Sequence, residues 1–541
     1  MMQADVETTS DLSRGRAADP GFRQAWIDAA ARRQLPPDGS TSGEFALSAP
    51  LDGDGRLVAV DRFARRTLCW TTRRGRFEVS ERADALGDGT LDAQALFDYL
   101  FFHMIPSPRT VFRGVQRLPP GHLALARGTE VEVRPYADLR FRPDASRDFA
   151  SLKAEFRRLL VEAVQCELER GVPACYLSGG TDSSTVAGHI RQVAGEVHTY
   201  AIGFDAEGYD ESGYARITVD RFRTEHHHYY VTPQDVVDAL PLVAAYYDEP
   251  FGNASAVPAY FCAKLAREAG IRNMLAGDGG DEIFGGNTRY VKQKVFEHWQ
   301  RVPGVVRRAL IEPLAMHFPL GERIAPVRKL RSYIAQANIP LPDRLETYNF
   351  LHRESLGEIF TPDFIADIDP EAPLAAQRAV YAAADCDSSL NRMLFLDMKF
   401  TMDDNDIRKV NGMCEMAGVN VHYPLIDLDM VRFAARVPVD MKIKGHKLRW
   451  FFKYALKDTL APETLTKSKH GFGLPFGVWL NDDPALHRMA TESLERLKGR
   501  GYLRPEYIDS LWARHRTEHS SYYGTMIWIC MMFEQWLEAH T

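Results

Sequence analysis

The sequence predicts an α/β protein of two domains, a β-rich domain followed by a doubly wound parallel sheet that carries a large helical extension. Three observations lead to this class. At 541 residues the chain is too long to fold around a single hydrophobic core. Short strand-like runs separated by turn residues fill about residues 44–82. Strand-like and helix-like segments then alternate between about residues 149 and 277, which is typical of parallel strands joined by crossover helices.

The first domain is predicted over residues 21–140, after a polar segment at 1–20 that we expect to be disordered. Its strands are expected in the sequences FALSAP, GRLVAVDRF, TLCWTT and RFEVS. A helix is expected at 91–105, and the segment after it reads as strand, turn and strand around Pro119-Pro120-Gly121. The sequence RFRPDASRD, at 140–148, is the expected linker to the second domain.

The second domain is predicted over residues 148–541. Its first helix is expected in FASLKAEFRRLLVEAVQCEL, whose apolar residues recur on one helical face. The expected strands are ACYL, VHTYAIGF, HHHYYVT and IRNMLAG, and the chain from about residue 290 is expected to be largely helical. The apolar run MIWICMMF is far shorter than the roughly 20 residues that span a bilayer, so we expect it in a buried helix.

Composition narrows the functional classes. The apolar share of 45% and charged share of 26% are ordinary for a soluble globular protein. A net charge of −7 argues against a broad nucleic-acid-binding surface. The seven cysteines show neither CxxC nor metal-ligand spacing, and the amino-terminal residues contain no apolar signal segment. We therefore expect a cytoplasmic protein without a nucleic-acid or membrane partner.

The sequence CYLSGGTDSST, at 175–185, ends a predicted strand with small donor residues and one acid. Ser178-Gly179-Gly180 then leads into a helix, where backbone N–H groups and the helix dipole favour an anion. No lysine lies in the loop, so it is not a Walker A phosphate site. Asp182 suits such a cradle if Mg²⁺ lies between it and the phosphates. The alternative is a serine-rich turn that only caps the helix.

A second carboxylate loop favours the anion site. The sequence LAGDGGDEIFGGN, at 275–287, also follows an apolar strand and contains Asp278, Asp281 and Glu282 among four glycines. Glycines allow the backbone to approach a ligand, and carboxylates provide metal ligands or a general base. Because ligands of open parallel sheets bind at the carboxyl ends of the strands, the two loops together indicate a site for ATP and Mg²⁺.

These motifs resemble known families. The SGGxDS pattern at 178–183 is similar to the pyrophosphate-binding loop of the ATP-pyrophosphatases, which have an adenine nucleotide alpha hydrolase-like fold. The synthetase domain of glutamine-dependent asparagine synthetases and their relatives is similar to YDESGYAR (209–216), DEPFGNASAVPAY (248–260), GDGGDEIFGG (277–286) and KSKHGFGLPFGVWL (467–480). The segments LVAVDRFARRTLCW and RTVFRGVQRLPPGHLALARGTEVEVRPYADL resemble the later part of that family's Ntn-hydrolase-like glutaminase domain.

The resemblance implies an ATP-dependent, AMP-forming carbon–nitrogen ligase. A substrate carboxylate would attack the α-phosphorus of ATP, pyrophosphate would leave, and an amine would then displace AMP from the acyl-adenylate. The implied partners are a small-molecule or peptide carboxylate and an amine. A homodimer is compatible with these motifs.

The resemblance also assigns roles to individual residues. Those expected to hold pyrophosphate are Ser178, Gly179, Gly180 and Ser183, and those expected to line the adenosine pocket are Leu177, Ile202, Ala276 and Gly277. Asp182 and Asp281 are the expected Mg²⁺ ligands. Lys469 would stabilise phosphate charge in the transition state. Asp278 would be the base that deprotonates the amine, with orientation of the metal ligands as its alternative role.

The sequence departs from the family in two places. Glutamine hydrolysis there needs a cysteine as the first residue, whereas this chain starts Met1-Met2-Gln3 and its first cysteine is Cys69. We therefore expect a degenerate glutaminase domain. The family's acidic and arginine residues before PFLD are replaced by Asn420 and His422. The resemblance places this pair next to the substrate cleft, so its replacement predicts a different substrate, with a compensated structural exchange as the alternative.

The run His226-His227-His228 suggests a metal site at first sight. Consecutive strand residues point to opposite faces, so three in a row cannot converge on one ion, and we interpret the run as structural.

The leading hypothesis is therefore an amide ligase without its own glutaminase, related to β-lactam synthetases and to the macrolactam-forming cyclases of lasso peptides. Asparagine synthesis from free ammonia stays open. Two other classes are an ATP-pyrophosphatase acting on tRNA or sulfur, which the acidic charge and absent CxxC oppose, and a non-catalytic ATP-binding scaffold. Intact Asp182, Asp281 and Lys469 argue against the scaffold.

Overall fold

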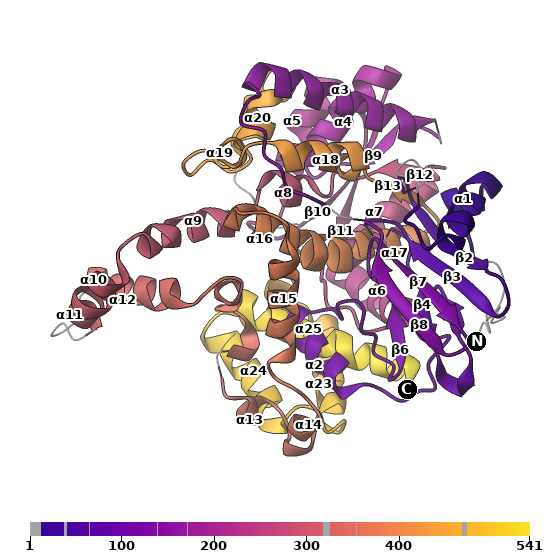
Figure 1. Cartoon of the computed structure of the whole chain (residues 1–541). Helices are drawn as coiled ribbons and strands as arrows, with labels where there is room; N and C mark the ends of the chain where they lie inside the picture. The colour runs from indigo at the N-terminus through magenta and orange to yellow at the C-terminus, as the bar shows by residue number, and fades with distance from the viewer. Residues whose placement is uncertain are drawn as a thin grey trace.

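The two-domain α/β fold expected from the sequence is confirmed in the computed structural model (Figure 1). It describes residues 12–36, 41–63, 65–137, 139–169, 171–316, 325–352, 354–467 and 473–541. In this part of the chain, no helix has both the length and the apolar character needed to cross a membrane.

The amino-terminal domain contains two antiparallel sheets. The five-stranded sheet has the order β1-β2-β3-β7-β8, with strands at Arg14–Gly15, Phe45–Pro50, Gly55–Val60, His122–Arg127 and Glu130–Pro135. The three-stranded sheet has the order β5-β4-β6, at Glu78–Ser80, Cys69–Thr71 and Val115–Arg117. Helix α1 (Pro20–Ala31) packs Phe22 against Phe45 of the larger sheet and Trp26 against Tyr136, which directly follows β8. Helix α2 (Ala93–Phe102) faces the second domain.

The disorder expected at residues 1–20 is wrong for residues 12–20, and residues 1–11 lie outside the described part. Strand β1 pairs with β2, so Arg14 lies opposite Ala46. Ala17 is buried in the core of the sheet, and Asp19 caps α1 by accepting a hydrogen bond from the Phe22 amide at 2.7 Å. Burial and capping therefore order a segment whose composition alone reads as unstructured.

The second domain is built on a parallel sheet with the order β11-β10-β9-β12-β13. Its strands are β9 (Ala174–Tyr176), β10 (His198–Phe204), β11 (Glu225–Val231), β12 (Asn273–Leu275) and β13 (Asn420–His422). One face is covered by α3 (Phe149–Leu168), α4 (Thr181–Ala194) and α5 (Ser212–Phe222). The other is covered by α6 (Pro233–Tyr246), α7 (Ala256–Glu268) and α17 (Arg408–Met416), as expected of a doubly wound sheet.

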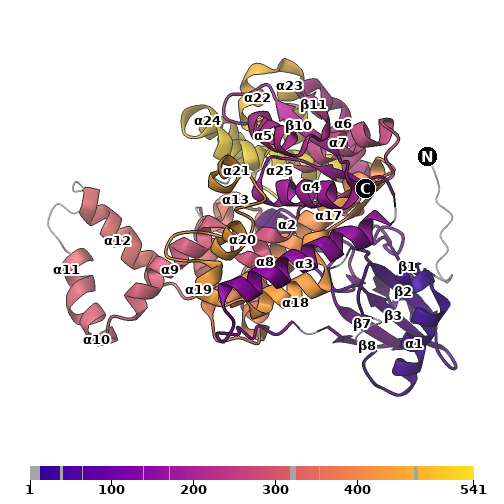
Figure 2. The same ribbon diagram turned by 90° about the horizontal axis from the view of Figure 1, so that it is seen from above.

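Helices dominate the rest of the chain, and Figures 1 and 2 show α9–α12 as an arm that extends away from both domains. The arm contains α9 (Thr288–Gln300), α10 (Gly304–Val306), η4 (Arg307–Ile311), α11 (Glu312–Met316) and α12 (Ala325–Asn338). After it come α13 (Leu356–Ile359), α14 (Pro362–Ala366), α15 (Ala372–Ala383), α16 (Ser389–Asp397), the π-helical η7 (Met398–Ile407), α18 (Leu428–Arg436), α19 (Val439–Lys442), α20 (Trp450–Ala455), α21 (Pro462–Thr466), α22 (Phe476–Asp482), α23 (Pro484–Lys498), α24 (Pro505–Thr517) and α25 (Ser520–His540). The apolar run MIWICMMF lies buried in α25.

A buried ion cluster joins the two domains. Arg117 of β6 contacts Glu249 through Nη1 and Asp248 through Nη2, and Arg408 of α17 contacts the same two carboxylates at 2.6 and 2.9 Å. Burial opposes ionisation of Asp248, but the two guanidinium groups hold the pKa of its carboxyl well below the ordinary value. Two charges of each sign therefore balance at the interface, and neither domain holds the cluster alone.

We predict that Arg117→Ala lowers the free energy of unfolding by about 3 kcal/mol, because it leaves a buried carboxylate under-compensated. Urea unfolding followed by tryptophan fluorescence measures the loss. Arg158→Ala is the control, since the Arg158–Glu162 pair on α3 is exposed, and its urea midpoint should stay close to that of the parent chain. Equal midpoints for the two variants would contradict the role of the cluster.

Candidate active site

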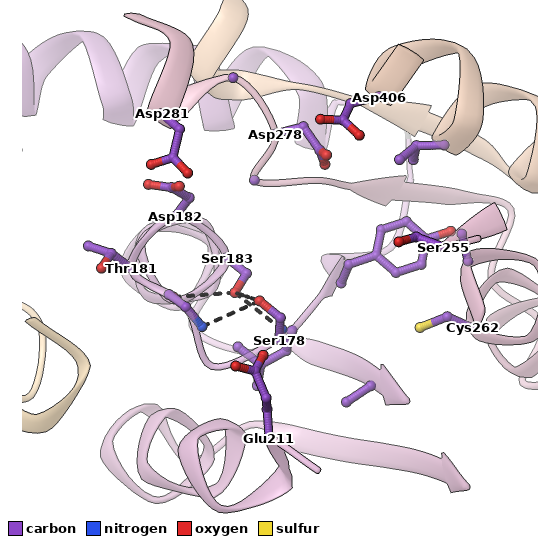
Figure 3. A pocket seen from close by; sticks show the side chains of 18 of the residues that line it. Ser178, Thr181, Asp182, Ser183, Glu211, Ser255, Cys262, Asp278, Asp281 and Asp406 are labelled. Atoms are coloured by element: carbon purple, nitrogen blue, oxygen red, sulfur yellow. Dashed lines mark hydrogen bonds between the residues drawn. The ribbon is translucent and has the colours of Figure 1, made fainter. Parts of the chain in front are cut away.

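A cavity of about 490 Å³ opens at the carboxyl ends of β9, β10 and β12, within the size range of small-molecule sites. Its walls come from the loop after β9, the start of α4, the loop after β12, α7 and the η7–α17 segment. Figure 3 shows its polar residues on both sides of the opening. Both loops that the sequence singled out lie in this one cavity.

The serine loop after β9 is held by its own hydroxyl groups. Ser178 Oγ lies 3.1 Å from Ser183 Oγ and accepts a hydrogen bond from the Gly180 amide at 3.3 Å. Gly179 has φ +69°, and a side chain there would lie 2.4 Å from the backbone of α5, so only glycine fits. The 14-residue helix α4 begins at Thr181 and directs its positive end into the cavity.

The second loop approaches the first through glycines. A Cβ on Gly277 would lie 2.7 Å from the Ser183 amide nitrogen, and one on Gly280 would lie 2.6 Å from Asp182 Oδ1. Such distances are shorter than real contacts allow, so the loop after β12 reaches the first turn of α4 only because these side chains are absent. This approach brings Asp281 next to Asp182 (Figure 3).

Asp182 and Asp281 converge on one point. Nη1 of Arg449 lies 2.6 Å from Asp182 Oδ2 and 2.8 Å from Asp281 Oδ1. Burial opposes the charge of Arg449, but the two carboxylates raise the pKa of its guanidinium above the ordinary value. Two carboxylate oxygens aimed at one position are the donor set that Mg²⁺ prefers, so these residues fit the ion that the sequence analysis expected.

Asp278 lies on the opposite wall, beside Asp406 (Figure 3). Burial raises the pKa of its carboxyl to about 6, with Asp406 and Asp281 adding to the effect and Lys409 opposing it. Lys409 donates to Asp406 at 2.9 Å, and although burial disfavours its charge, Asp406 and Asp278 raise the pKa of the amine. A carboxyl that titrates near neutrality in a cavity can exchange a proton with a ligand.

The structure brings most of the expected site residues together. Those that line the cavity are Leu177, Ser178, Gly180, Asp182, Ser183, Ile202, Gly277, Asp278 and Asp281. Gly179 and Ala276 lie behind this lining and shape the two loops. Lys469 lies outside the described residues.

Four further charged residues that no sequence pattern predicted line the cavity: Arg449, Lys467, Asp406 and Lys409. Lys467 is almost fully buried, donates to the Ser178 carbonyl at 3.3 Å and pairs with Glu211 at 3.0 Å. It lies two residues before Lys469 in the same motif, so that motif could have drawn attention to it. Asp406 and Lys409 lie in η7 and α17, and Arg449 lies in the turn before α20, so none of the three follows a strand.

Asn420 and His422 do not lie where the sequence analysis placed them. Asn420 begins β13 opposite Asn273, at the amino ends of the strands, and neither residue lines the large cavity. They line a separate interdomain pocket together with Glu44, Arg65 and Arg66. His422 Nδ1 lies 3.4 Å from Glu167. Asn420 starts its strand and so lies at the end away from the cavity. His422 ends the strand, but its ring lies beside Glu44 and Glu167 instead of the cavity.

Cys69 is the only cysteine in the described part of the amino-terminal domain. It lies on β4 with no exposed surface, and burial raises the pKa of its thiol to about 12. A thiol that stays protonated and buried is a poor nucleophile.

The fold and the cavity define a two-domain protein with a polar cavity at the carboxyl ends of a parallel sheet. Comparison with protein families identifies the asparagine synthase family over residues 155–538, and the chain belongs to this family. A glutamine amidotransferase domain matches residues 40–137. Proteins of the asparagine synthetase family are carbon–nitrogen ligases that convert ATP to AMP and pyrophosphate.

Three relatives illustrate the match. Asparagine synthetase [glutamine-hydrolyzing] 1 of Bacillus subtilis is 23% identical over 88% of this chain and 74% of its own length. Putative asparagine synthetase [glutamine-hydrolyzing] 2 of Methanocaldococcus jannaschii is 35% identical over 40% of this chain and 42% of its own. A putative asparagine synthetase [glutamine-hydrolyzing] of Mycobacterium bovis is 25% identical over 73% of this chain, which spans 59% of that relative.

The raised pKa of Asp278 predicts a pH-dependent stability. The folded chain keeps the proton up to about pH 6, whereas the unfolded chain releases it near pH 4, so this group lowers stability as the pH rises between those values. Asp278→Asn should therefore match the parent chain at pH 4 and exceed it by up to about 3 kcal/mol at pH 8. Urea unfolding at both values tests this, with exposed Asp52→Asn as control. A stability difference between Asp278→Asn and the parent chain that stays the same at both pH values would contradict the raised pKa of Asp278.

Proposed function

We propose that the chain is an ATP-dependent, AMP-forming amide ligase. It activates a substrate carboxylate as its adenylate and joins it to an amine, without glutamine hydrolysis of its own. The observation that carries the proposal is the convergence of Asp182 and Asp281 on one position, next to the serine loop and the start of α4. A polar turn that only capped a helix would not need two carboxylates from separate loops at one point.

The serine loop is the proposed pyrophosphate cradle. Ser178 and Ser183 would supply hydroxyl donors, the backbone of Gly179 and Gly180 lets phosphate oxygens come close, and the dipole of α4 favours the negative charge. The ammonium group of Lys467 lies at the same loop and would neutralise phosphate charge, in addition to the role proposed for Lys469.

Asp182 and Asp281 are the proposed Mg²⁺ ligands. The bound ion would neutralise phosphate oxygens and favour departure of pyrophosphate. Arg449 now neutralises the two carboxylates, and its side chain would turn from them to the phosphates when the ion binds. Leu177, Ile202 and Gly277, with Ala276 behind them, are the proposed walls for adenosine, and they supply the apolar surface that a purine ring requires.

Asp278 is the proposed base for the second half of the reaction. In its ionised form, which predominates above about pH 6, it would accept a proton from the attacking amine. Lys409 faces the same part of the cavity and would stabilise a carboxylate of the acyl substrate or the charge that builds on phosphate.

The amine is proposed to come with the substrate rather than from glutamine. Support comes from Cys69, whose burial and raised pKa make it unfit as a nucleophile. A substrate that carries its own amine could close an amide within itself, including a macrolactam. The competing outcome is asparagine formation from aspartate and free ammonia, which the assays below distinguish.

The first test is ATP–pyrophosphate exchange over a panel of carboxylates that runs from aspartate to peptides with free carboxylates. Asp182→Asn and Asp281→Asn should each reduce the exchange rate at least about a hundredfold, because each removes one anionic ligand from the cation position. Asp220→Asn on the exposed face of α5 is the matched control and should leave the rate unchanged. Failure to bind Mg²⁺-ATP, or unchanged exchange in Asp182→Asn, would refute the proposal.

The second test concerns the nitrogen source. Incubation with glutamine and Mg²⁺-ATP should release no glutamate above a protein-free control, and Cys69→Ser should behave like the parent chain, because the thiol is buried. Product formation with ammonium and aspartate would support the asparagine synthetase alternative. Glutamate release by the purified chain would overturn the proposed absence of glutaminase activity.

A further inference from the structure

Three side chains at the edge of the parallel sheet converge away from the active-site cavity. His198 begins β10, and Glu225 and His227 are the first and third residues of the edge strand β11. His198 lies opposite Glu225 in the parallel register, and Tyr200 lies opposite His227. Because side chains alternate along a strand, His198, Glu225 and His227 share one face of the sheet.

The distances among these groups suit a shared ion. Glu225 Oε1 lies 3.4 Å from His227 Nε2, Glu225 Oε2 lies 3.6 Å from His198 Nδ1, and one set of ligand atoms from the three residues lies within 4.8 Å. Hydrogen bonds between nitrogen and oxygen are shorter, mostly about 2.7–3.2 Å. Two ligands that bind Zn²⁺ at about 2.0–2.1 Å with tetrahedral geometry lie roughly 3.4 Å apart.

The environment of His227 gives a second reason to expect a bound metal ion. Its Nε2 atom is buried, and within the described part of the chain it makes no hydrogen bond. Its ring is fixed by stacking on Tyr200, at 4.8 Å between centroids and 8° between planes, so the nitrogen is held toward Glu225. A buried, oriented imidazole nitrogen without a hydrogen bond suits a metal ligand.

The structural interpretation of the triple histidine run therefore applies to His226 and His228, but not to His227. His226 and His228 face the other side of β11, where His226 contacts Thr199 at 3.0 Å and His228 packs on Tyr230. The partner that completes the cluster is His198, which comes from the neighbouring strand.

We propose that His198, Glu225 and His227 form a binding site for a divalent transition metal of the Zn²⁺ class. Two imidazoles and one carboxylate suit Zn²⁺ better than Mg²⁺, which prefers oxygen ligands. The site leaves the fourth position to water. The ion joins the edge strand β11 to β10 and fixes the His227–Tyr200 stack, and Tyr200 is also part of the active-site wall. The site thus braces the sheet at the strand ends opposite to the proposed Mg²⁺ position.

Titration of the full chain with ZnCl₂, in excess MgCl₂ to occupy the carboxylate loops, tests the proposal by calorimetry. One equivalent should bind, and Co²⁺ should give the visible absorption of a four-coordinate site. Glu225→Gln and His227→Ala should each weaken binding at least about tenfold, since even outer-sphere changes cost that much at metal sites. His228→Ala, on the opposite face of the same strand, is the matched control and should bind as the parent chain does.

Thermal unfolding gives a second measurement that does not depend on catalysis. Zn²⁺ should raise the melting temperature of the parent chain and of His228→Ala, and at the same concentration should raise that of Glu225→Gln less. Absence of binding, binding that is unaffected in both Glu225→Gln and His227→Ala, or equal loss in His228→Ala would overturn the proposal. None of these outcomes depends on the ligase activity, so the two proposals fail separately.

Discussion

The approach of Gly277 to the first turn of α4 is the contact on which the candidate site depends. Only a residue without a side chain lets the loop after β12 reach the Ser183 amide. Gly280 likewise leaves room for the Asp182 carboxylate. These approaches place two carboxylates against one guanidinium group, that of Arg449. A larger residue at Gly277 would separate the two loops, because it would meet the backbone of α4, and one at Gly280 would displace the Asp182 side chain.

The amino-terminal domain supports the other wall of this cavity. Arg117 pairs with the carboxylates that hold Arg408, the Arg65 carbonyl accepts from Asn411 at 2.8 Å, and Ser107 donates to Asp404 at 3.0 Å. These contacts brace the η7–α17 segment, which places Asp406 and Lys409 in the cavity. The site therefore needs the amino-terminal domain as a support, whether or not that domain catalyses a reaction itself.

Sequence reasoning succeeded where the signal was local. The strands before SGGTDS and GDGGDE, and the helix after the first, follow from short apolar runs that end in glycine, and they place Ser178, Asp182 and Asp281 correctly in one cavity. It missed β13, which has three residues and follows a long helical region, and so it misplaced Asn420. Arg449 and Lys409 were missed because tertiary packing, rather than any local pattern, brings them to the strand ends.

The proposed ligase reaction requires that the two loops form one site for the phosphates of ATP and their metal ion. A crystal structure of the chain with Mg²⁺ and a non-hydrolysable ATP analogue would show where the phosphates and the ion bind. We expect one ion bound by Asp182 and Asp281, phosphates against Ser178 and Ser183, and the Arg449 side chain turned from the carboxylates to the phosphates. Phosphates bound elsewhere, with Arg449 still bridging Asp182 and Asp281, would contradict this expectation.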